Sequence, residues 1–361
     1  MKAIILAGGT GTRLWPMSRE AKPKQFCELV SSEPLIRDTY RRLLRAFPAE
    51  KIYFSVSAAL EQNLRDHFVD IPEAQIIVEP EKRDTGPAMG YVAAMLELDD
   101  PDEPIVFVPS DHYIGDEEKF LKCLSIGEQL ILETGKMLDI GVVPTFPSTV
   151  LGYTKFGNKI EAREGIEVYE FLGHTEKPPF EVAKQYLEDG SYLWHASYYM
   201  WTPRKFMTAI ETYAPEMAVV LRGIQTVRRG EWPFAPTNEI NGLYSQLSKI
   251  SFDYAVTEKM NPSDVLIIKG DFGWSDIGAW DTLYDRLSDG SDNVVKGNSI
   301  LIETTGSLIY APEGKTVAVL GMNDIVVVDT GDALLVCPKS QAQRVKEIIS
   351  KLQEKNQHDL L

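Results

Sequence analysis

The chain has 361 residues, of which 44% are hydrophobic, and this length suffices for a full core and for two domains. Its formal net charge of −16 repels phosphate backbones, which argues against nucleic acid as a partner. No apolar run approaches the ~18 to 20 residues that cross a bilayer, so no membrane association is expected. Three widely spaced cysteines without a CxxC pair argue against a disulfide framework or a zinc site, and they fit a reducing cytoplasm.

The first half of the chain alternates short apolar strands with helical patterns. Strands are expected at 2–7, 51–56, 74–79, 103–108 and 137–143, and helices near 34–46, 58–69, 86–98 and 117–134. Apolar strands separated by helices of this length indicate an α/β fold with a Rossmann-like, mostly parallel sheet that is covered on both faces. In such sheets the ligand binds beyond the carboxyl ends of the strands.

The pattern changes twice in the second half. Residues 150–290 mix strands with helices near 203–229 and 237–260, and we interpret them as an insertion and extension beside the ligand crevice. From about 293 onward, short strands recur between Gly, Asn, Asp and Pro residues, which predicts a small β domain of the solenoid kind. The expected domains are therefore 1–290 and 291–361. Because short strands expose their edges, the small domain is expected to pack on the larger one and to offer a homodimer contact.

A glycine loop, LAGGTGTRLWPMSREAKPKQF, follows the first strand. It contains the glycines Gly8, Gly9 and Gly11 and the cations Arg13, Lys22 and Lys24. Glycines allow the backbone to approach a ligand closely, and successive N–H groups can converge on phosphate oxygens. The pattern matches neither GxGxxG nor GxxxxGK[ST], and a glycine turn alone is often purely structural. The three cations make polyphosphate binding the favoured interpretation.

Two carboxylates are candidate metal ligands. Asp111 follows the strand at 103–108, at the carboxyl edge of the sheet, where Mg²⁺ would find a carboxylate together with phosphate oxygens. Asp276 lies in GWSDIG. Either residue could instead be a turn or a helix cap, and Asp276 could cap a helix beginning at Ile277. The adjacent Ser110, Asp111 and His112 cannot form a hydrolase triad, because neighbours in sequence lack the relay geometry.

The glycine loop resembles the nucleotidyltransferase signature of the sugar-nucleotide pyrophosphorylases, and its form is similar to that of the mannose-1-phosphate guanylyltransferases. Further motifs of that family follow in order: VEPEKRDTGPA (78–88), VPSDHYI (108–114), EKP (176–178), SFDYAV (251–256) and GWSDIGAWDTLY (273–284). The resemblance implies a nucleotidyltransferase-type fold and the transfer of GMP from GTP to α-D-mannose 1-phosphate, which gives GDP-mannose and pyrophosphate with Mg²⁺ as cofactor.

The resemblance also implies roles for individual residues. The expected catalytic residues are Arg13, Lys24, Asp111 and Lys177. The expected nucleotide-binding residues are Leu6, Ala7, Gly8, Gly9, Thr10, Gly11, Thr12, Arg13, Lys24, Glu79, Arg83, Thr85, Gly86, Pro87, Ser110 and Asp111. The expected sugar-phosphate residues are Gly152, Tyr153, Glu176, Lys177, His195 and Asp276, and the expected metal ligands are Asp111 and Asp276. Asp253 in SFDYAV either supports the metal site or caps a helix.

The sugar site departs from the family at one position. Where the family commonly has WNSG or WNAG, this chain has Trp194, His195, Ala196 and Ser197. Histidine and asparagine both offer a donor and an acceptor but differ in reach, so the identity of the sugar is open, and His195 could equally be a core histidine. Without the other motifs, Glu176 and Lys177 would be an ordinary exposed pair at a turn.

Two alternative functions follow from these uncertainties. One is the same chemistry on another sugar 1-phosphate, such as a heptose, and the sequence alone does not distinguish guanine from other bases. The other is a catalytically silent subunit that binds sugar nucleotide. The silent subunit is disfavoured by the presence of Arg13, Lys24, Asp111, Lys177 and Asp276. A sugar phosphate is already anionic, because its second pKa is about 6, so no general base is expected.

Overall fold

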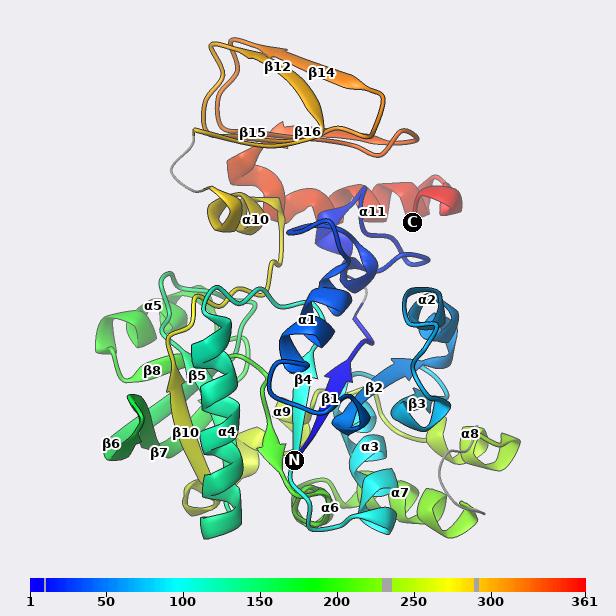
Figure 1. The fold of residues 1–361 in the computed structure, drawn as a ribbon, viewed down its shortest axis with the longest axis vertical. Helices are drawn as coiled ribbons and strands as arrows, with labels where there is room; N and C mark the ends of the chain where they lie inside the picture. The colour runs from blue at the N-terminus through cyan, green and yellow to red at the C-terminus, as the bar shows by residue number, and fades with distance from the viewer. Residues whose placement is uncertain (10, 229–235, 289–291) are drawn as a thin grey trace. The chain divides into compact units, whose positions relative to one another are not determined.

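The protein is described by a computed structural model that covers residues 1–9, 11–228, 236–288 and 292–361. The chain forms two compact units (Figure 1). Unit 1 comprises Met1–Gly8, Tyr40–Pro109 and Ile114–Trp274, and unit 2 comprises Gly9–Thr39, Ser110–Tyr113 and Ser275–Leu361. The division into domains near residue 290 remains a prediction. The units defined by packing differ from it, because the glycine-loop segment groups with the C-terminal region.

Unit 1 is built on one sheet of ten strands in the order β10-β7-β6-β8-β5-β9-β4-β1-β2-β3. The strands are β1 (Lys2–Leu6), β2 (Ile52–Ser57), β3 (Ile76–Glu79), β4 (Ile105–Pro109), β5 (Met137–Val142), β6 (Tyr153–Arg163), β7 (Ile166–Thr175), β8 (Tyr192–His195), β9 (Met200–Trp201) and β10 (Val265–Gly270). Strands β4, β1, β2 and β3 are parallel, and β10 also pairs in parallel with β5. The predicted α/β class is confirmed, and β6 to β9 add antiparallel pairings.

The helices of unit 1 are α1 (Leu35–Leu43, which begins in unit 2), α2 (Glu61–His67), α3 (Thr85–Asp99), α4 (Glu117–Thr134), α5 (Phe180–Asp189), α6 (Pro203–Tyr213), α7 (Pro215–Val227), α8 (Asn238–Tyr244) and α9 (Phe252–Ala255). They lie at the expected ranges except for α5, which was not expected, and the ranges 203–229 and 237–260 each contain two α-helices in the described residues. Helix α4 begins where the Asp116 side chain accepts a hydrogen bond from the Lys119 N–H, and it ends at Gly135 with a φ of 66°. Within the described ranges, no helix is both long and apolar enough to cross a membrane.

The parallel strands of unit 1 end together. Leu6 at the end of β1 is in register with Pro109 at the end of β4 and with Ser55 in β2, and Ser57 is in register with Glu79. The glycine loop starts at this edge, because a Cβ atom on Gly8 would lie 3.4 Å from Glu79 Oε1. The predicted placement of Gly8 beside the carboxyl ends of the strands is thus confirmed.

The described C-terminal region of unit 2 contains short strands between two α-helices. The strands are β11 (Asn293–Lys296), β12 (Asn298–Ile302), β13 (Ser307–Tyr310), β14 (Thr316–Leu320), β15 (Ile325–Asp329) and β16 (Leu334–Pro338). The helices are α10 (Trp280–Leu287) and α11 (Lys346–Glu354). Strands β11, β13 and β15 pair in parallel in one sheet, and β12 and β14 pair in parallel in another, which lies opposite β15 in Figure 1. Because β11 to β15 alternate between the two sheets, the chain coils, and the predicted solenoid is confirmed; β16 then pairs antiparallel with β15 in the first sheet.

The core of unit 2 joins the glycine-loop segment to this solenoid. Its buried side chains include Leu14, Trp15, Cys27, Leu29, Trp280, Leu308, Tyr310, Val326 and Leu335. Trp15 Nε1 donates a hydrogen bond to the carbonyl of Leu360 at 2.8 Å, and Trp280 Nε1 donates to the carbonyl of Trp15 at 3.0 Å. Arg19 forms two hydrogen bonds with the carboxylate of Asp332 at 2.7 and 2.8 Å. The segment that carries the candidate phosphate-binding cations is therefore held by residues from the other end of the chain.

Candidate functional site

The glycine loop in unit 2 takes a conformation that requires glycine at one position. Gly11 has a φ of 59°, and a Cβ atom there would collide with the Cβ atom of Lys24. Ser18 Oγ donates to the carbonyl of Gly11 at 2.5 Å, and Gln25 Nε2 donates to the carbonyl of Gly9 at 3.0 Å. The stem of Lys24 therefore lies directly against the loop. Thr10, an expected nucleotide-binding residue, lies outside the described residues.

Lys24 contacts both candidate metal ligands, Asp111 and Asp276. Its buried ammonium lies 2.8 Å from Asp111 Oδ2 and donates to the carbonyl of Asp276 at 2.5 Å. Burial alone would raise the pKa of Asp111, but the charges of Lys24 and His112 and the hydrogen bond from Lys24 together outweigh burial and hold that pKa below its usual value. Asp111 is thus an ionised carboxylate at neutral pH, and an ionised carboxylate is an oxygen donor that suits a hard divalent cation.

The side chains of Asp276 and Arg13 both lie beside Gly278. A Cβ atom on Gly278 would lie 2.7 Å from Asp276 Oδ2 and 3.3 Å from Arg13 Nη2. Arg13 Nη1 also donates to Gln343 Oε1 at 3.2 Å. The capping interpretation of Asp276 is not supported, because α10 begins only at Trp280 and has no side-chain cap. Unit 2 thus gathers two cationic side chains and two carboxylates, a set that fits a divalent metal with bound phosphate.

The turn at 83–87 in unit 1 is tied to the segment before α9. Gly86 N–H donates to the carbonyl of Ile250 at 3.0 Å, and a Cβ atom on Gly86 would lie 2.6 Å from that oxygen. Thr85 Oγ1 accepts a hydrogen bond from the backbone N–H of Phe252 at 3.0 Å. Arg83 Nη1 donates to the carbonyl of Leu247 at 2.5 Å. These bonds fix the backbone of a turn that the family motif assigns to the nucleotide.

Glu79, another expected nucleotide-binding residue, is buried at the end of β3. Its Oε2 accepts a hydrogen bond from the hydroxyl of Tyr244 at 2.7 Å. Burial raises the pKa of Glu79 from 4.5 to about 7, although the hydrogen bond from Tyr244 opposes this rise. Sequence reasoning missed Tyr244, because its hydroxyl meets Glu79 only through the packing of α8.

Glu79 predicts a pH dependence of stability. The folded state binds its proton more tightly than the unfolded state, so this stabilisation is complete below pH 4.5 and is lost as the pH rises through about 7. Glu79→Gln keeps an acceptor for Tyr244 and removes the charge. We expect the free energy of unfolding of the variant to exceed that of the wild type by about 3 kcal/mol at pH 8 and by about 1 kcal/mol near pH 5.5. Urea denaturation measures both values, and a difference that does not change with pH would contradict this account.

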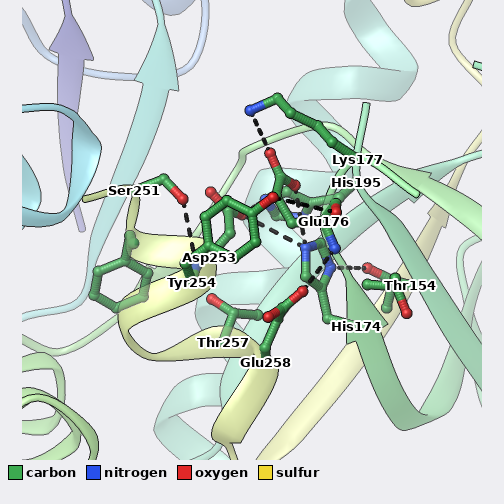
Figure 2. Close-up of polar contacts among 12 residues, drawn as sticks. Thr154, His174, Glu176, Lys177, His195, Ser251, Asp253, Tyr254, Thr257 and Glu258 are labelled. Atoms are coloured by element: carbon green, nitrogen blue, oxygen red, sulfur yellow. Dashed lines mark hydrogen bonds and ion pairs between the residues drawn. The ribbon is translucent and has the colours of Figure 1, made fainter. Parts of the chain in front are cut away.

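Four adjacent strands of unit 1 build the candidate sugar-phosphate region. His174 on β7, Thr154 on β6, His195 on β8 and Asp139 on β5 contribute one side chain each. These side chains gather with those of Glu176 and Asp253 (Figure 2).

His195 lies between two carboxylates in this cluster. Its Nδ1 is 2.9 Å from Asp139 Oδ1, and its Nε2 is 3.3 Å from Asp253 Oδ1. Burial alone would lower the pKa of His195, but the charges of Asp139 and Asp253 raise it to about 9. Both ring nitrogens thus face carboxylates, and only 4% of the residue is exposed. This environment favours the core-histidine interpretation over direct contact with a sugar hydroxyl.

Lys177 and Glu176 form an ion pair at the end of β7. Lys177 Nζ lies 2.6 Å from Glu176 Oε1, and the lysine side chain is half exposed. Gly152 packs against this pair, because a Cβ atom there would collide with Glu176 Oε2. The Tyr153 hydroxyl accepts from the backbone N–H of Ser148 at 2.8 Å and donates to the carbonyl of Ser148 at 3.2 Å. Tyr153 thus braces the loop that leads to Gly152.

Four of the eight non-glycine residues with positive φ in the described ranges lie in the family motifs. They are Asp84, Lys177, Ser197 and Ile277, with φ values of 70°, 46°, 58° and 42°. They lie in RDTGP, EKP, WHAS and GWSDIG. Such conformations are unfavourable for side chains with a Cβ atom and persist where the surrounding structure enforces them, commonly at functional sites. Ser197 stands where the family motif has glycine, and its φ explains why that motif has glycine there.

Comparison with known proteins identifies the family. Residues 2–292 match the family described as nucleotidyl transferase. The chain belongs to that family. Residues 297–352 match the MannoseP isomerase/GMP-like beta-helix domain, which agrees with the solenoid of unit 2.

Relatives of known name cover nearly the whole chain. An Escherichia coli mannose-1-phosphate guanylyltransferase is 32% identical over 355 residues, which are 97% of this chain and 75% of the relative. A Vibrio cholerae protein to which the same name is provisionally given is 35% identical over 370 residues, 98% of this chain and 74% of the relative. A solved structure from Thermus thermophilus, named a mannose-1-phosphate geranyltransferase, is 31% identical with a TM-score of 0.85, and the match covers 98% of this chain and 99% of that one.

Sequence reasoning missed Asp139 and His174. Asp139 is a charged residue inside the apolar run MLDIGVV, and a buried charge needs a partner, which was an available signal. His174 lies two residues before Glu176, and this spacing places both side chains on one face of an extended strand. Their contacts with Thr154 and His195 depend on strand pairing that the sequence does not reveal.

Proposed function

We propose that this nucleotidyltransferase converts GTP and α-D-mannose 1-phosphate into GDP-mannose and pyrophosphate. The observation that carries the proposal is the cluster of Arg13, Lys24, Asp111 and Asp276 in unit 2, which three segments of the family signature bring together. Relatives of this name match nearly the whole chain.

Catalysis in this proposal consists of positioning and charge neutralisation. The sugar phosphate attacks the α-phosphorus of GTP in line with the departing pyrophosphate, and it needs no general base because it is already anionic. Arg13 and Lys24 stabilise the negative charge of the pyrophosphate, and Lys177 binds and orients the phosphate of the sugar. Mg²⁺, held by Asp111 and Asp276, supplies further neutralisation of phosphate charge when it is bound.

The family motifs assign the phosphates of the nucleotide to the glycine loop, and the base and ribose to the turn at 83–87. The loop residues are Leu6, Ala7, Gly8, Gly9, Thr10, Gly11 and Thr12, with Ser110 beside Asp111. Arg83, Thr85, Gly86 and Pro87 face the base and ribose, and Glu79 supports the loop at Gly8. The hydrogen bonds of this turn to Ile250 and Phe252 support a rigid binding surface.

The sugar in this proposal contacts Glu176 and the loop at Gly152 and Tyr153. His195 contributes by attracting the carboxylates of Asp139 and Asp253, which lie 2.9 and 3.3 Å from its two ring nitrogens. Since asparagine in the family motif is replaced by histidine here, a different sugar 1-phosphate, such as a heptose, is the second candidate substrate.

We further propose that the protein acts in the cytoplasm and forms a homodimer. Cys27, Cys123 and Cys337 are free thiols, as in proteins of reducing compartments. The solenoid exposes apolar side chains that a second copy would cover, namely Ile300, Ile302, Leu320, Leu334 and Val336.

Lys177→Ala tests the assignment of the substrates. Wild-type protein is expected to release pyrophosphate only when GTP and mannose 1-phosphate are both present with Mg²⁺. The variant loses one charge-assisted contact of about 1.5–3 kcal/mol, so KM for mannose 1-phosphate should rise about 10- to 100-fold while KM for GTP stays nearly constant. Lys184→Ala, which removes an exposed lysine of α5, is the control and should change neither constant. An equal rise of both KM values would refute the role of Lys177.

A further inference from the structure

Three side chains that can bind a metal lie close together in unit 1, and none of them is among the metal ligands expected from the family motifs. His174, Glu176 and Asp253 each offer one ligand atom, and these atoms all lie within 4.8 Å of one another. His174 Nε2 is 3.4 Å from Glu176 Oε2 and 3.8 Å from Asp253 Oδ1. Two ligand atoms on one tetrahedral zinc ion are about 3.4 Å apart, because each lies about 2.1 Å from the metal. Both distances from His174 Nε2 are therefore close to the spacing of two ligands on one ion.

The hydrogen-bond network assigns the protonation of His174. The Thr154 hydroxyl donates its single proton to Asp139 Oδ2 at 3.1 Å. Toward His174 Nδ1, at 3.2 Å, the same hydroxyl can therefore only accept, so Nδ1 carries a hydrogen. The ring nitrogen that is open to a metal ion is therefore Nε2, which faces Glu176 and Asp253 (Figure 2).

Two of the three ligand side chains also contact a further side chain that fixes their orientation, as is usual in metal sites. Asp253 Oδ1 accepts a hydrogen bond from the Tyr199 hydroxyl at 2.6 Å, and Glu176 Oε1 is paired with Lys177 at 2.6 Å. Space beside the ligands is kept open by Gly152, whose Cβ atom, if present, would lie 2.9 Å from His174 Nε2 and would collide with Glu176 Oε2.

We propose that His174, Glu176 and Asp253 bind a divalent transition-metal ion of the Zn²⁺ type, in addition to the Mg²⁺ proposed for Asp111 and Asp276. One imidazole nitrogen with two carboxylates suits Zn²⁺, Co²⁺ or Mn²⁺, whereas Mg²⁺ prefers oxygen ligands alone. Three protein ligands leave a coordination position open. This binding does not depend on the nucleotidyl-transfer activity.

Metal titration of the full chain tests the proposal. Protein freed of metal by a chelator is titrated with Zn²⁺ by calorimetry in excess Mg²⁺, and with Co²⁺ by visible absorption. We expect one Zn²⁺ per chain with micromolar or tighter Kd. The Co²⁺ form should show d–d bands without the sulfur-to-metal charge-transfer band that binding to cysteine would give. Wild-type protein that binds no Zn²⁺ under these conditions would overturn the proposal.

Variants locate the ion. His174→Gln should weaken Zn²⁺ binding by about 100-fold or more, and Thr154→Val, which removes the partner of Nδ1, by about 10- to 100-fold. Gly152→Ala places a methyl group in the site and should abolish binding without removing a ligand.

The matched control is His358→Gln, which replaces an exposed histidine near the C-terminus and should leave binding unchanged. Circular dichroism verifies each fold. If His174→Gln fails to fold, Thr154→Val and Gly152→Ala decide, and wild-type affinity in all three would refute the site.

Discussion

Replacing Asp111 with asparagine should lower kcat by about 100-fold or more while the protein keeps its fold. Asp111 is an ionised carboxylate 2.8 Å from the ammonium of Lys24. Asparagine has nearly the same volume but no charge, so it removes the group that would hold a divalent metal and balance Lys24. Pyrophosphate release at saturating substrates measures kcat, and circular dichroism measures the fold.

The control for this variant is Asp271→Asn, which neutralises an exposed carboxylate of unit 1. It should keep near-normal kcat. If Asp111→Asn retained wild-type kcat with unchanged dependence on Mg²⁺ concentration, the assignment of Asp111 to the metal would be wrong.

Deleting residues 292–361 should destroy the stability of the protein as well as its activity. The deletion would expose Leu14, Trp15, Cys27, Leu29 and Trp280, which are now buried against the solenoid and the terminal helix. Each large apolar side chain contributes about 1.5–3 kcal/mol through burial, and several together approach the whole net stability of a domain, about 5–15 kcal/mol. The deletion also removes Gln343, which binds Arg13. We expect aggregated protein without a cooperative melting transition.

A milder variant serves as the control for the deletion. Tyr310→Phe removes one hydrogen bond, from the tyrosine hydroxyl to the carbonyl of Leu29, and leaves the ring in the core. It should cost about 1–2 kcal/mol and preserve activity. A deleted protein that was monodisperse, active and as stable as the wild type would contradict the view that the C-terminal region supports the glycine loop.

Local patterns predicted most of the fold. The apolar runs at 2–7 and 103–108 became β1 and β4, because uninterrupted apolar residues between helices are typical of buried parallel strands. The solenoid was predictable from its regularly spaced turn residues. The mixed pairing of β6 to β9 was not, because it depends on contacts between strands distant in sequence.

Residues of the candidate site could be predicted where the residue type and its position in a motif are enough to indicate a role. Lys24 and Asp111 are examples, and they form an ion pair in the structure. His195 does not, because its environment is set by Asp139 and Asp253, which lie 56 residues before it and 58 residues after it in the numbering. The anchoring of Arg13 by Gln343 spans 330 residues and likewise has no local signal.

The most direct test of the proposed reaction is a substrate matrix. Purified protein is incubated with each of the four nucleoside triphosphates against mannose, glucose, galactose and heptose 1-phosphates in the presence of Mg²⁺, and pyrophosphate release gives kcat/KM for every pair. The account predicts the highest value for GTP with mannose 1-phosphate. A higher value for another sugar 1-phosphate would contradict the mannose assignment, and no pyrophosphate release from any pair would contradict nucleotidyl transfer itself.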